Sequence, residues 1–106
     1  MSDAANRLRE ARKLIERGWC QDHYAETASG RECHWLDDVA AKWCILGAIN
    51  HANGCLLFSS EPEIILSGAV GRQPLGAWND EPGRTQAEVL AAFDKAIALA
   101  ESENAQ

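Results

Sequence analysis

An apolar run in the middle of the chain, from Trp43 to Ile49, constrains the fold more than any other feature of the sequence. A helix that is apolar on every side is usually covered by other elements on several sides. We therefore expect a central core helix from about Asp37 to Asn53, with Gly54 as its stop. A chain of 106 residues can bury one modest core, so we expect a single helical domain over residues 1–106.

Helical signals also mark both ends of the chain. The stretch from Asp3 to Arg17 places apolar residues at helical spacing, and Gly18 follows where a left-handed C-terminal cap is expected. Near the other end, Thr85 and Glu88 form the pattern of a capping box, in which each side chain binds the other residue's backbone amide. An apolar stripe at helical spacing follows, which predicts a long last helix.

A weaker helical signal lies between the central and the last helix. Ser60 precedes Pro62, and proline is favoured in a first helical turn. We expect a short helix that carries the aliphatic residues 64–66 and ends at Gly68. Residues 55–58 are apolar enough for a strand, but no other segment alternates to pair with them. The sequence therefore predicts an all-α fold, a compact single-domain bundle of three to four helices with irregular loops at about 19–35 and 69–84.

The charge balance argues against nucleic acid as a direct partner. The chain has 10 basic and 16 acidic residues, a formal net charge of −6, and only the first helix is basic. Nucleic-acid binders normally present a positive surface, because neutralising phosphates and releasing counterions supplies much of their affinity. Arg9, Lys13 and Arg17 form one stripe on that helix. Glu10 and Glu16 partly neutralise it, so we interpret the stripe as a solvated face.

Membrane and targeting signals are missing from the sequence. No apolar stretch approaches the roughly 20 residues of a membrane-spanning helix. The N-terminal segment lacks the apolar stretch of a signal peptide. We therefore expect a cytoplasmic protein with no membrane partner.

Cysteine and histidine residues raise the question of a metal site. Four soft ligands fall within one expected loop, as a tetrahedral zinc site would need, and they are Cys20, His23, Cys33 and His34. Their spacing is poor, because adjacent residues do not readily face the same ion and two spaced pairs are missing. We therefore expect no metal and no other cofactor, and keep a zinc-stabilised domain as an alternative. A Cys20–Cys33 disulfide is disfavoured in a reducing cytosol.

An unusual segment precedes the last helix. Pro82 and Gly83 suit the central positions of a type II turn. Just before them, Trp78, Asn79 and Asp80 place a large aromatic ring beside two hydrogen-bonding side chains. We interpret this triplet as structural, with the polar groups bonded to backbone, and keep a polar pocket as the alternative. The candidate binding residues of this segment are Trp78, Asn79, Asp80, Glu81 and Arg84.

Five segments together carry a resemblance: Gly18-Trp19, the WCILGA segment from Trp43, the WND segment from Trp78, the TxxEVL segment from Thr85 and the DxAI segment from Asp94. In this order they resemble a family of small bacterial and phage proteins of unknown function, over nearly the whole chain. The resemblance implies a compact, mainly helical fold and a small soluble protein that sometimes travels with phages. It implies no particular activity, substrate or catalytic set. The residues that match its motifs are Trp43, Cys44, Gly47, Trp78, Asn79 and Asp80, whereas the four zinc candidates and His51 match none.

No convincing catalytic constellation is present, so we expect a non-enzymatic protein-binding module in preference to an enzyme. In this hypothesis a phage-derived accessory or inhibitor protein presents an acidic surface to a basic protein partner. A small-ligand or catalytic site around the WND segment is the alternative from a different class. The acids that we expect to form the contact surface are Glu81, Glu88, Asp94, Glu101 and Glu103.

We expect a monomer in preference to a homodimer. Ser60 and Pro62 favour a helix that would fold residues 64–66 back over the central helix and complete its cover. If this segment projects instead, its three aliphatic side chains form a patch that would pair with a second copy.

Overall fold

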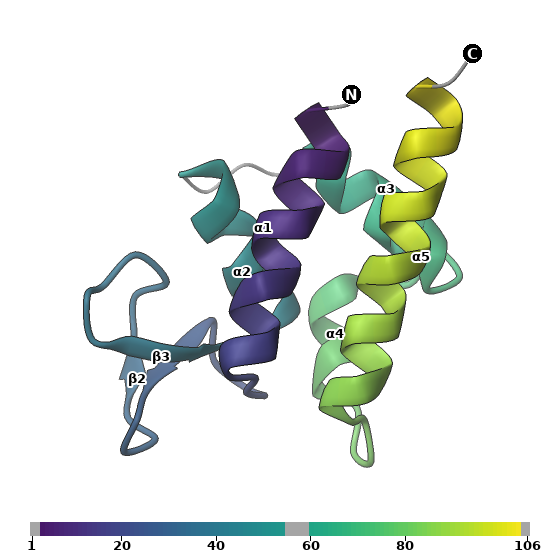
Figure 1. The fold of residues 1–106 in the computed structure, drawn as a ribbon. Coiled ribbons are helices and arrows are strands. Elements are labelled where there is room, and N and C mark those ends of the chain that lie inside the picture. Colours follow the sequence, from purple (N-terminus) through teal and green to yellow (C-terminus); the bar gives the residue numbers. More distant parts are fainter. Residues whose placement is uncertain (1–2, 55–59, 105–106) are drawn as a thin grey trace.

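The computed structural model describes residues 3–54 and 60–104 (Figure 1). Over these residues it contains five helices and a three-stranded antiparallel sheet, so the fold is mixed α and β. The expected all-α bundle of three to four helices is therefore wrong. The elements are α1 Asp3–Arg17, β1 Ala25–Thr27, β2 Glu32–Cys33, β3 Ala40–Trp43, α2 Ile45–Asn53, α3 Glu61–Ala69, α4 Leu75–Asp80 and α5 Gln86–Asn104.

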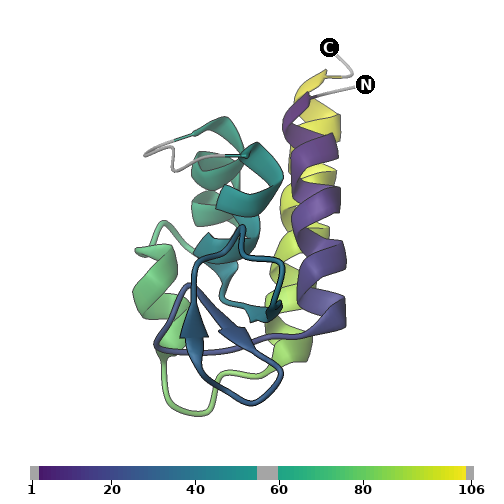
Figure 2. The same cartoon turned by 90° about the vertical axis from the view of Figure 1, so that its left-hand side faces the viewer.

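Helices α1 and α5 lie side by side along the length of the molecule (Figure 2). Their inner stripes bury Leu8, Ile15 and Phe93 completely in the main core. Helix α1 has the predicted bounds, but Gly18 does not adopt the left-handed conformation expected of a cap. A Cβ atom at Gly18 would lie 2.3 Å from the carbonyl oxygen of Ala41, so this glycine permits a close approach of two backbones.

The sheet occupies the region for which the sequence predicts an irregular loop at 19–35. Its strand order is β2-β1-β3, and Ala25 lies opposite both Cys33 and Trp43. Gly30, at a φ of 91°, turns the chain between β1 and β2. The strands have only two to four residues, too few for the alternation that identifies a strand in a sequence.

The central helix is shorter than predicted, because it begins at Ile45 and not at Asp37. The residues just before it form β3, since their backbone groups pair with β1. Cys44 caps the helix through its sulfur atom, which accepts a hydrogen bond from the backbone N–H of Gly47 at 3.3 Å. The end of the helix is confirmed, because Gly54 has a left-handed φ of 80°.

The prediction of a second irregular loop at 69–84 is also partly wrong. It contains the short helix α4, so the WND segment forms the end of a helix. Before it, α3 begins after Ser60 as predicted but continues through Gly68. Its residue Leu66 is fully buried, whereas the side chain of Ile64 is 59% exposed. The possible strand at 55–58 lies outside the described residues.

The predicted capping box of the last helix is confirmed. The Thr85 hydroxyl accepts a hydrogen bond from the Glu88 N–H at 3.2 Å, and the Glu88 carboxylate accepts one from the Thr85 N–H at 2.9 Å. The second bond is the main reason why the pKa of Glu88 is lowered. Before the cap, Arg84 donates its N–H to the carbonyl oxygen of Glu81 at 3.0 Å, and Gly83 has a φ of 89°, as a type II turn requires.

None of the helices formed by the described residues is both long and apolar enough to cross a membrane.

Candidate functional site

The side chain of Asn79 lies at the centre of a buried hydrogen-bond network. Its oxygen accepts hydrogen bonds from the indole N–H of Trp19 at 2.8 Å and the backbone N–H of Ile45 at 3.0 Å. Its nitrogen donates to the carbonyl oxygen of Cys20 at 3.2 Å and to Asp80 Oδ1 at 2.9 Å. Every donor and acceptor of this fully buried amide is used, so Asn79 joins three parts of the chain and leaves nothing for a ligand.

The other candidate residues of this segment also make internal contacts. Arg84 donates from Nε to the carbonyl oxygen of Trp78 at 2.9 Å, and its guanidinium lies 4.0 Å from the centre of the Trp78 ring. The same guanidinium pairs with Glu81 and Glu88 at 3.4 and 3.2 Å. Gln21 donates to the carbonyl oxygens of Asn79 and Glu81 at 3.0 and 3.1 Å. The structure therefore brings the five predicted binding residues together. Their hydrogen bonds and ion pairs fix the end of α4 in place.

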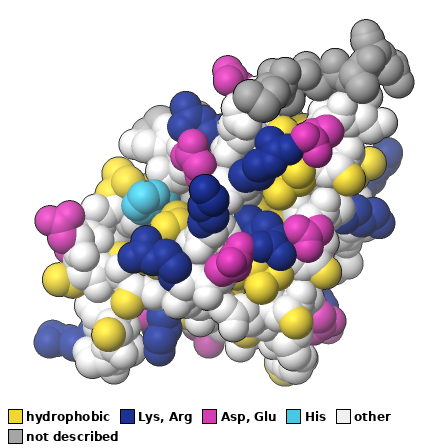
Figure 3. All heavy atoms as spheres, in the orientation of Figure 1, with side chains coloured by type: hydrophobic (Ala, Val, Ile, Leu, Met, Phe, Trp, Pro, Cys, Tyr) yellow, Lys and Arg dark blue, Asp and Glu magenta, His cyan; other side chains and the backbone are white. Residues whose placement is uncertain are grey.

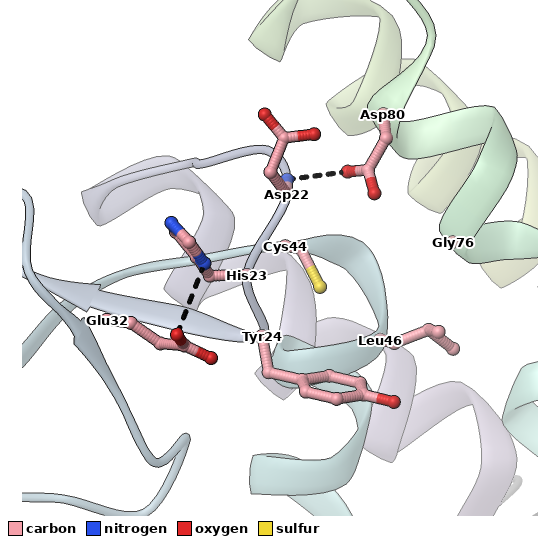
Figure 4. Close-up of a pocket in the computed structure, with 8 residues that line it drawn as sticks. All are labelled: Asp22, His23, Tyr24, Glu32, Cys44, Leu46, Gly76 and Asp80. Carbon is pink, nitrogen blue, oxygen red and sulfur yellow. Dashed lines mark hydrogen bonds and ion pairs between the residues drawn. The ribbon is translucent and has the colours of Figure 1, made fainter.

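Asp80 is the exception, because it also faces a pocket of about 220 Å³ between α4, the start of α2 and the segment before β1 (Figure 4). We call this space the acidic pocket, since three of its lining residues are carboxylates. Its lining residues are Asp22, His23, Tyr24, Glu32, Cys44, Leu46, Gly76 and Asp80.

Asp22 and Asp80 lie next to each other at one end of the acidic pocket, where the backbone nitrogen of Asp22 faces the Asp80 carboxylate (Figure 4). Asp80 Oδ1 accepts a hydrogen bond from the backbone N–H of Asp22 at 2.9 Å. This bond fixes Asp22 in the left-handed region at a φ of 72°, which non-glycine residues other than Asp and Asn rarely adopt. The Tyr24 ring and Leu46 line the other end, and His23 Nδ1 lies 3.6 Å from the Glu32 carboxylate at the side.

Gly47 determines how closely Tyr24 approaches helix α2. A Cβ atom at this position would lie 1.9 Å from the carbonyl oxygen of Tyr24, so only glycine fits. The same carbonyl accepts a hydrogen bond from the Cys44 N–H at 3.1 Å. The WCILGA segment thus performs two local tasks, since Cys44 caps the helix and Gly47 lets the pocket wall pack against it.

The thiols near the acidic pocket are poor nucleophiles. Burial raises the pKa of Cys44 to about 11 and that of Cys20 to about 12, so both remain protonated at neutral pH. Burial also raises the pKa of Cys33. The structure therefore offers no thiolate for covalent catalysis at these three positions.

The acids at the pocket and on the helices differ in their neighbours. Within the described residues, no lysine or arginine pairs with Asp22, Asp80 or Glu32. On the surface formed by α1 and α5, which we call the α1–α5 face, cations and acids lie next to one another (Figure 3). There Arg12 binds Asp94 at 2.7 Å and Arg9 binds Glu101.

The acidic contact surface expected from the sequence is therefore largely neutralised. Four of its five acids, Glu81, Glu88, Asp94 and Glu101, form ion pairs with arginine residues. The side chain of the fifth, Glu103, lies outside the described part of the structure. The acidic pocket, in contrast, is lined by Asp22 and Asp80, for which no arginine or lysine partner is found among the described residues.

The four zinc candidates have other neighbours. His34 accepts a hydrogen bond from the Leu36 N–H at 3.1 Å and stacks on Trp35, and His23 lies between Glu26 and Glu32. Cys20 and Cys33 are free thiols. Among the residues that the structure describes, no three His, Cys, Asp or Glu side chains are placed to hold a metal ion.

Sequence reasoning found Asp80 but missed most of the acidic pocket, including Asp22, Tyr24 and Glu32. These residues come from a region predicted to be an irregular loop, and bonds made by Asn79, Gln21 and the Asp22 N–H join this region to the end of α4. Their one local signal is a pair of acids, Asp22 and Glu32, ten positions apart, which is too common in sequences to identify a site.

Comparison with known proteins gives a family for this chain. No curated protein and no solved structure matches it. A model described as a family of unknown function, DUF6197, matches residues 1–99. The chain therefore belongs to the DUF6197 family.

Proposed function

We propose that the protein is a non-enzymatic protein-binding module whose acidic pocket receives a basic side chain of a partner protein. The observation that carries this proposal is the concave site where Asp22 and Asp80 lie together without a lysine or arginine partner among the described residues. Charge complementarity of this kind gives an interface its specificity and speeds association.

The size of the acidic pocket favours a single side chain over a whole small molecule. Its volume of about 220 Å³ is below the range of roughly 300–1,000 Å³ that is typical of small-ligand sites. The side chains of lysine and arginine are long and narrow, and only their ends are charged. Such a side chain can place its charge at Asp22 and Asp80 while its alkyl part passes Leu46 and the Tyr24 ring.

The Tyr24 ring adds a second attraction for a cation. It is 43% exposed and lines the same space as the two aspartates. A cation over an aromatic ring gains roughly 0.5–1 kcal/mol at an exposed site. Arginine benefits most, because its planar guanidinium can bind a carboxylate and stack on a ring.

The proposal places the module in the cytoplasm as an accessory or inhibitor protein of phage origin. The free thiols of Cys20, Cys33 and Cys44 support a reducing compartment, where disulfides are rare. An acidic protein that binds a basic side chain can occupy a surface that otherwise binds phosphate groups.

The test is an NMR titration of the protein with a capped peptide that contains one arginine. We expect shifts at the amides of Tyr24, Leu46 and Gly76, and their loss when salt rises to about 0.5 M, where the Debye length is well below 8 Å. A peptide with citrulline in place of arginine keeps the shape without the charge and should leave these amides unchanged. Equal shifts from both peptides, or shifts elsewhere only, would contradict the proposal.

Two isosteric substitutions identify the groups that bind. Asp22→Asn and Asp80→Asn each remove one charge, and asparagine tolerates the left-handed backbone at position 22. Each should weaken binding of the arginine peptide several-fold. The matched control Asp94→Asn removes the same charge from the α1–α5 face and should leave binding unchanged.

A further inference from the structure

A second surface, which does not share any lining residue with the acidic pocket, lies between α3 and α5. It is a groove of about 510 Å³ whose apolar wall is formed by Ile64, Ile65 and Leu99. Ile64 is 59% exposed and Leu99 is 41% exposed, so two large aliphatic side chains meet water at one groove. The expectation of a monomer rests on residues 64–66 folding back over the central helix. In the structure Leu66 is fully buried in the core, whereas Ile64 faces water.

The groove also carries two charges of opposite sign, Glu63 and Arg72. Neither side chain forms an ion pair within the described chain, in contrast to Arg7, Arg9 and Arg12 of α1. Glu63 lies in the first turn of α3, and Arg72 lies just beyond the end of the helix, where its N–H donates to the Ser67 carbonyl oxygen at 2.7 Å. The two charges therefore lie toward opposite ends of α3, and Ser67 and Gly68 line the same groove. A Cβ atom added at Gly68 would meet nothing within 4 Å, so the backbone is open to a close neighbour at this point.

This arrangement is self-complementary. In a two-fold symmetric interface, residue i of one copy faces residue j of the other, and residue j faces residue i. If two α3 helices cross antiparallel near Ser67 and Gly68, Glu63 of each copy approaches Arg72 of the other. The same crossing covers Ile64 and Leu99 of both copies, because both residues line the groove that the second copy enters.

We propose that a second copy of this chain occupies the groove, forming a two-fold symmetric dimer through α3 and α5. The dimer contains the Glu63–Arg72 ion pair twice, and it buries the exposed aliphatic residues of both copies. This proposal is independent of the acidic pocket, and each copy in the dimer keeps its own pocket open to a partner.

The test is the mass of the protein in solution, measured by light scattering and sedimentation from micromolar to near-millimolar concentration. We expect the mass to rise from 11.6 kDa toward twice that value. A mass that stays at 11.6 kDa over this range overturns the proposal.

Charge reversal distinguishes this dimer from other modes of association. Glu63→Arg places two arginines at each end of the interface and Arg72→Glu places two glutamates there, so each variant alone should weaken dimerisation at least tenfold. An equal mixture of the two variants, or the double variant E63R/R72E, restores opposite charges at both ends and should restore the dimer. Failure of both to do so overturns the antiparallel arrangement.

A neighbouring acid provides the matched control. Glu61→Arg makes the same charge change on the same helix, at a residue that does not line the groove. We expect it to dimerise like the wild type, and a loss as large as that of Glu63→Arg overturns the proposal. Circular dichroism at a concentration where all variants are monomeric checks that each one is folded.

Discussion

On the α1–α5 face, Asp94 and Glu101 lie beside arginines, whereas at the acidic pocket Asp22 and Asp80 lie beside each other. The two regions are also built differently. The two long helices meet through apolar stripes that carry ion pairs at their exposed edges. The pocket side consists of short elements, joined by the buried amide of Asn79 and by a glycine contact.

The difference shows that the net charge of a protein does not indicate where it can bind a cation. Exposed ion pairs contribute roughly 0–1 kcal/mol each and reduce the attraction that their acids exert on a partner. Acids without such partners keep this attraction, and a concave site strengthens it. We therefore expect substitutions on the pocket side to affect stability strongly when they touch its framework, and substitutions on the α1–α5 face to affect it weakly.

The largest expected effect comes from Asn79→Ala. The substitution leaves the Trp19 indole N–H, the Ile45 N–H and the Cys20 carbonyl oxygen without their buried partner. Each unsatisfied buried group costs about 1–3 kcal/mol, so the free energy of unfolding should fall by about 4 kcal/mol. Urea denaturation measures this change.

The control for this prediction is an asparagine on the α1–α5 side. The side chain of Asn6 accepts one hydrogen bond, from Arg9, and is partly exposed. Asn6→Ala should change the unfolding free energy by less than about 0.5 kcal/mol, since alanine also favours the helix. Equal losses from the two alanine substitutions would remove the difference between the regions.

The next largest effect is expected from Gly47→Ala. The added Cβ atom would lie 1.9 Å from the Tyr24 carbonyl oxygen, and neither backbone can move without disturbing its hydrogen bonds. We expect a loss of about 3 kcal/mol by thermal or chemical denaturation. Gly68→Ala makes the same change where a Cβ meets nothing, and it should stabilise the monomer by up to about 1 kcal/mol. A tolerated Gly47→Ala would contradict the close packing of the pocket wall.

An intermediate effect concerns alkaline pH. The pKa of Cys20 is raised in the folded state to about 12 from an ordinary value of 9.0. The unfolded chain therefore loses this proton first, so the stability is complete below pH 9 and falls as the pH rises toward 12. The loss attributable to one thiol is roughly 1.4 kcal/mol per pH unit in this window.

The measurement compares the wild type with Cys20→Ala across this pH range. The variant should lose less stability than the wild type between pH 9 and pH 11, even if it is less stable at pH 7. Parallel curves for the two proteins would show that the buried thiol does not titrate in this way.

The smallest effect is expected on the α1–α5 face. Arg12→Ala removes the exposed pairs with Glu16 and Asp94, and the unfolding free energy should fall by no more than about 1 kcal/mol. Because salt screens exposed charges, the difference from the wild type should shrink as salt is added. A loss as large as that of Asn79→Ala would show that the helical region also depends on a specific polar contact.

The sequence was a good guide to those elements whose signals are local. Helix α1 has a long apolar stripe, α5 has a capping box, and α2 ends at a left-handed glycine, so each signal lies within the element itself. The strands have no such signal. Residues 40–43 lead into the apolar run and are predicted to belong to its helix, but they pair with β1 and form a strand. Here tertiary contacts override the local pattern.

The acidic pocket could not be predicted for a related reason. Asp80 stood out because it lies in the WND segment, but Asp22 and Tyr24 belong to a stretch about 60 positions earlier in the chain. No periodicity connects two such distant segments. The amide of Asn79 makes the buried part of the connection, and the sequence does not indicate which of several polar side chains is buried.

The hydrogen bonds of Asn79 have a consequence for the order in which the chain folds. They join residues 59 and 60 positions apart, so forming them closes a long loop of the chain. This closure costs conformational entropy before the hydrogen bonds can stabilise the fold. Helices α1 and α5 contain strong local signals and can begin to form earlier, but a chain that has only these helices has no pocket. Under the proposed function, binding of a partner therefore requires the complete native state. A partner of this kind binds the native state and not the unfolded chain, so by mass action it stabilises the folded protein.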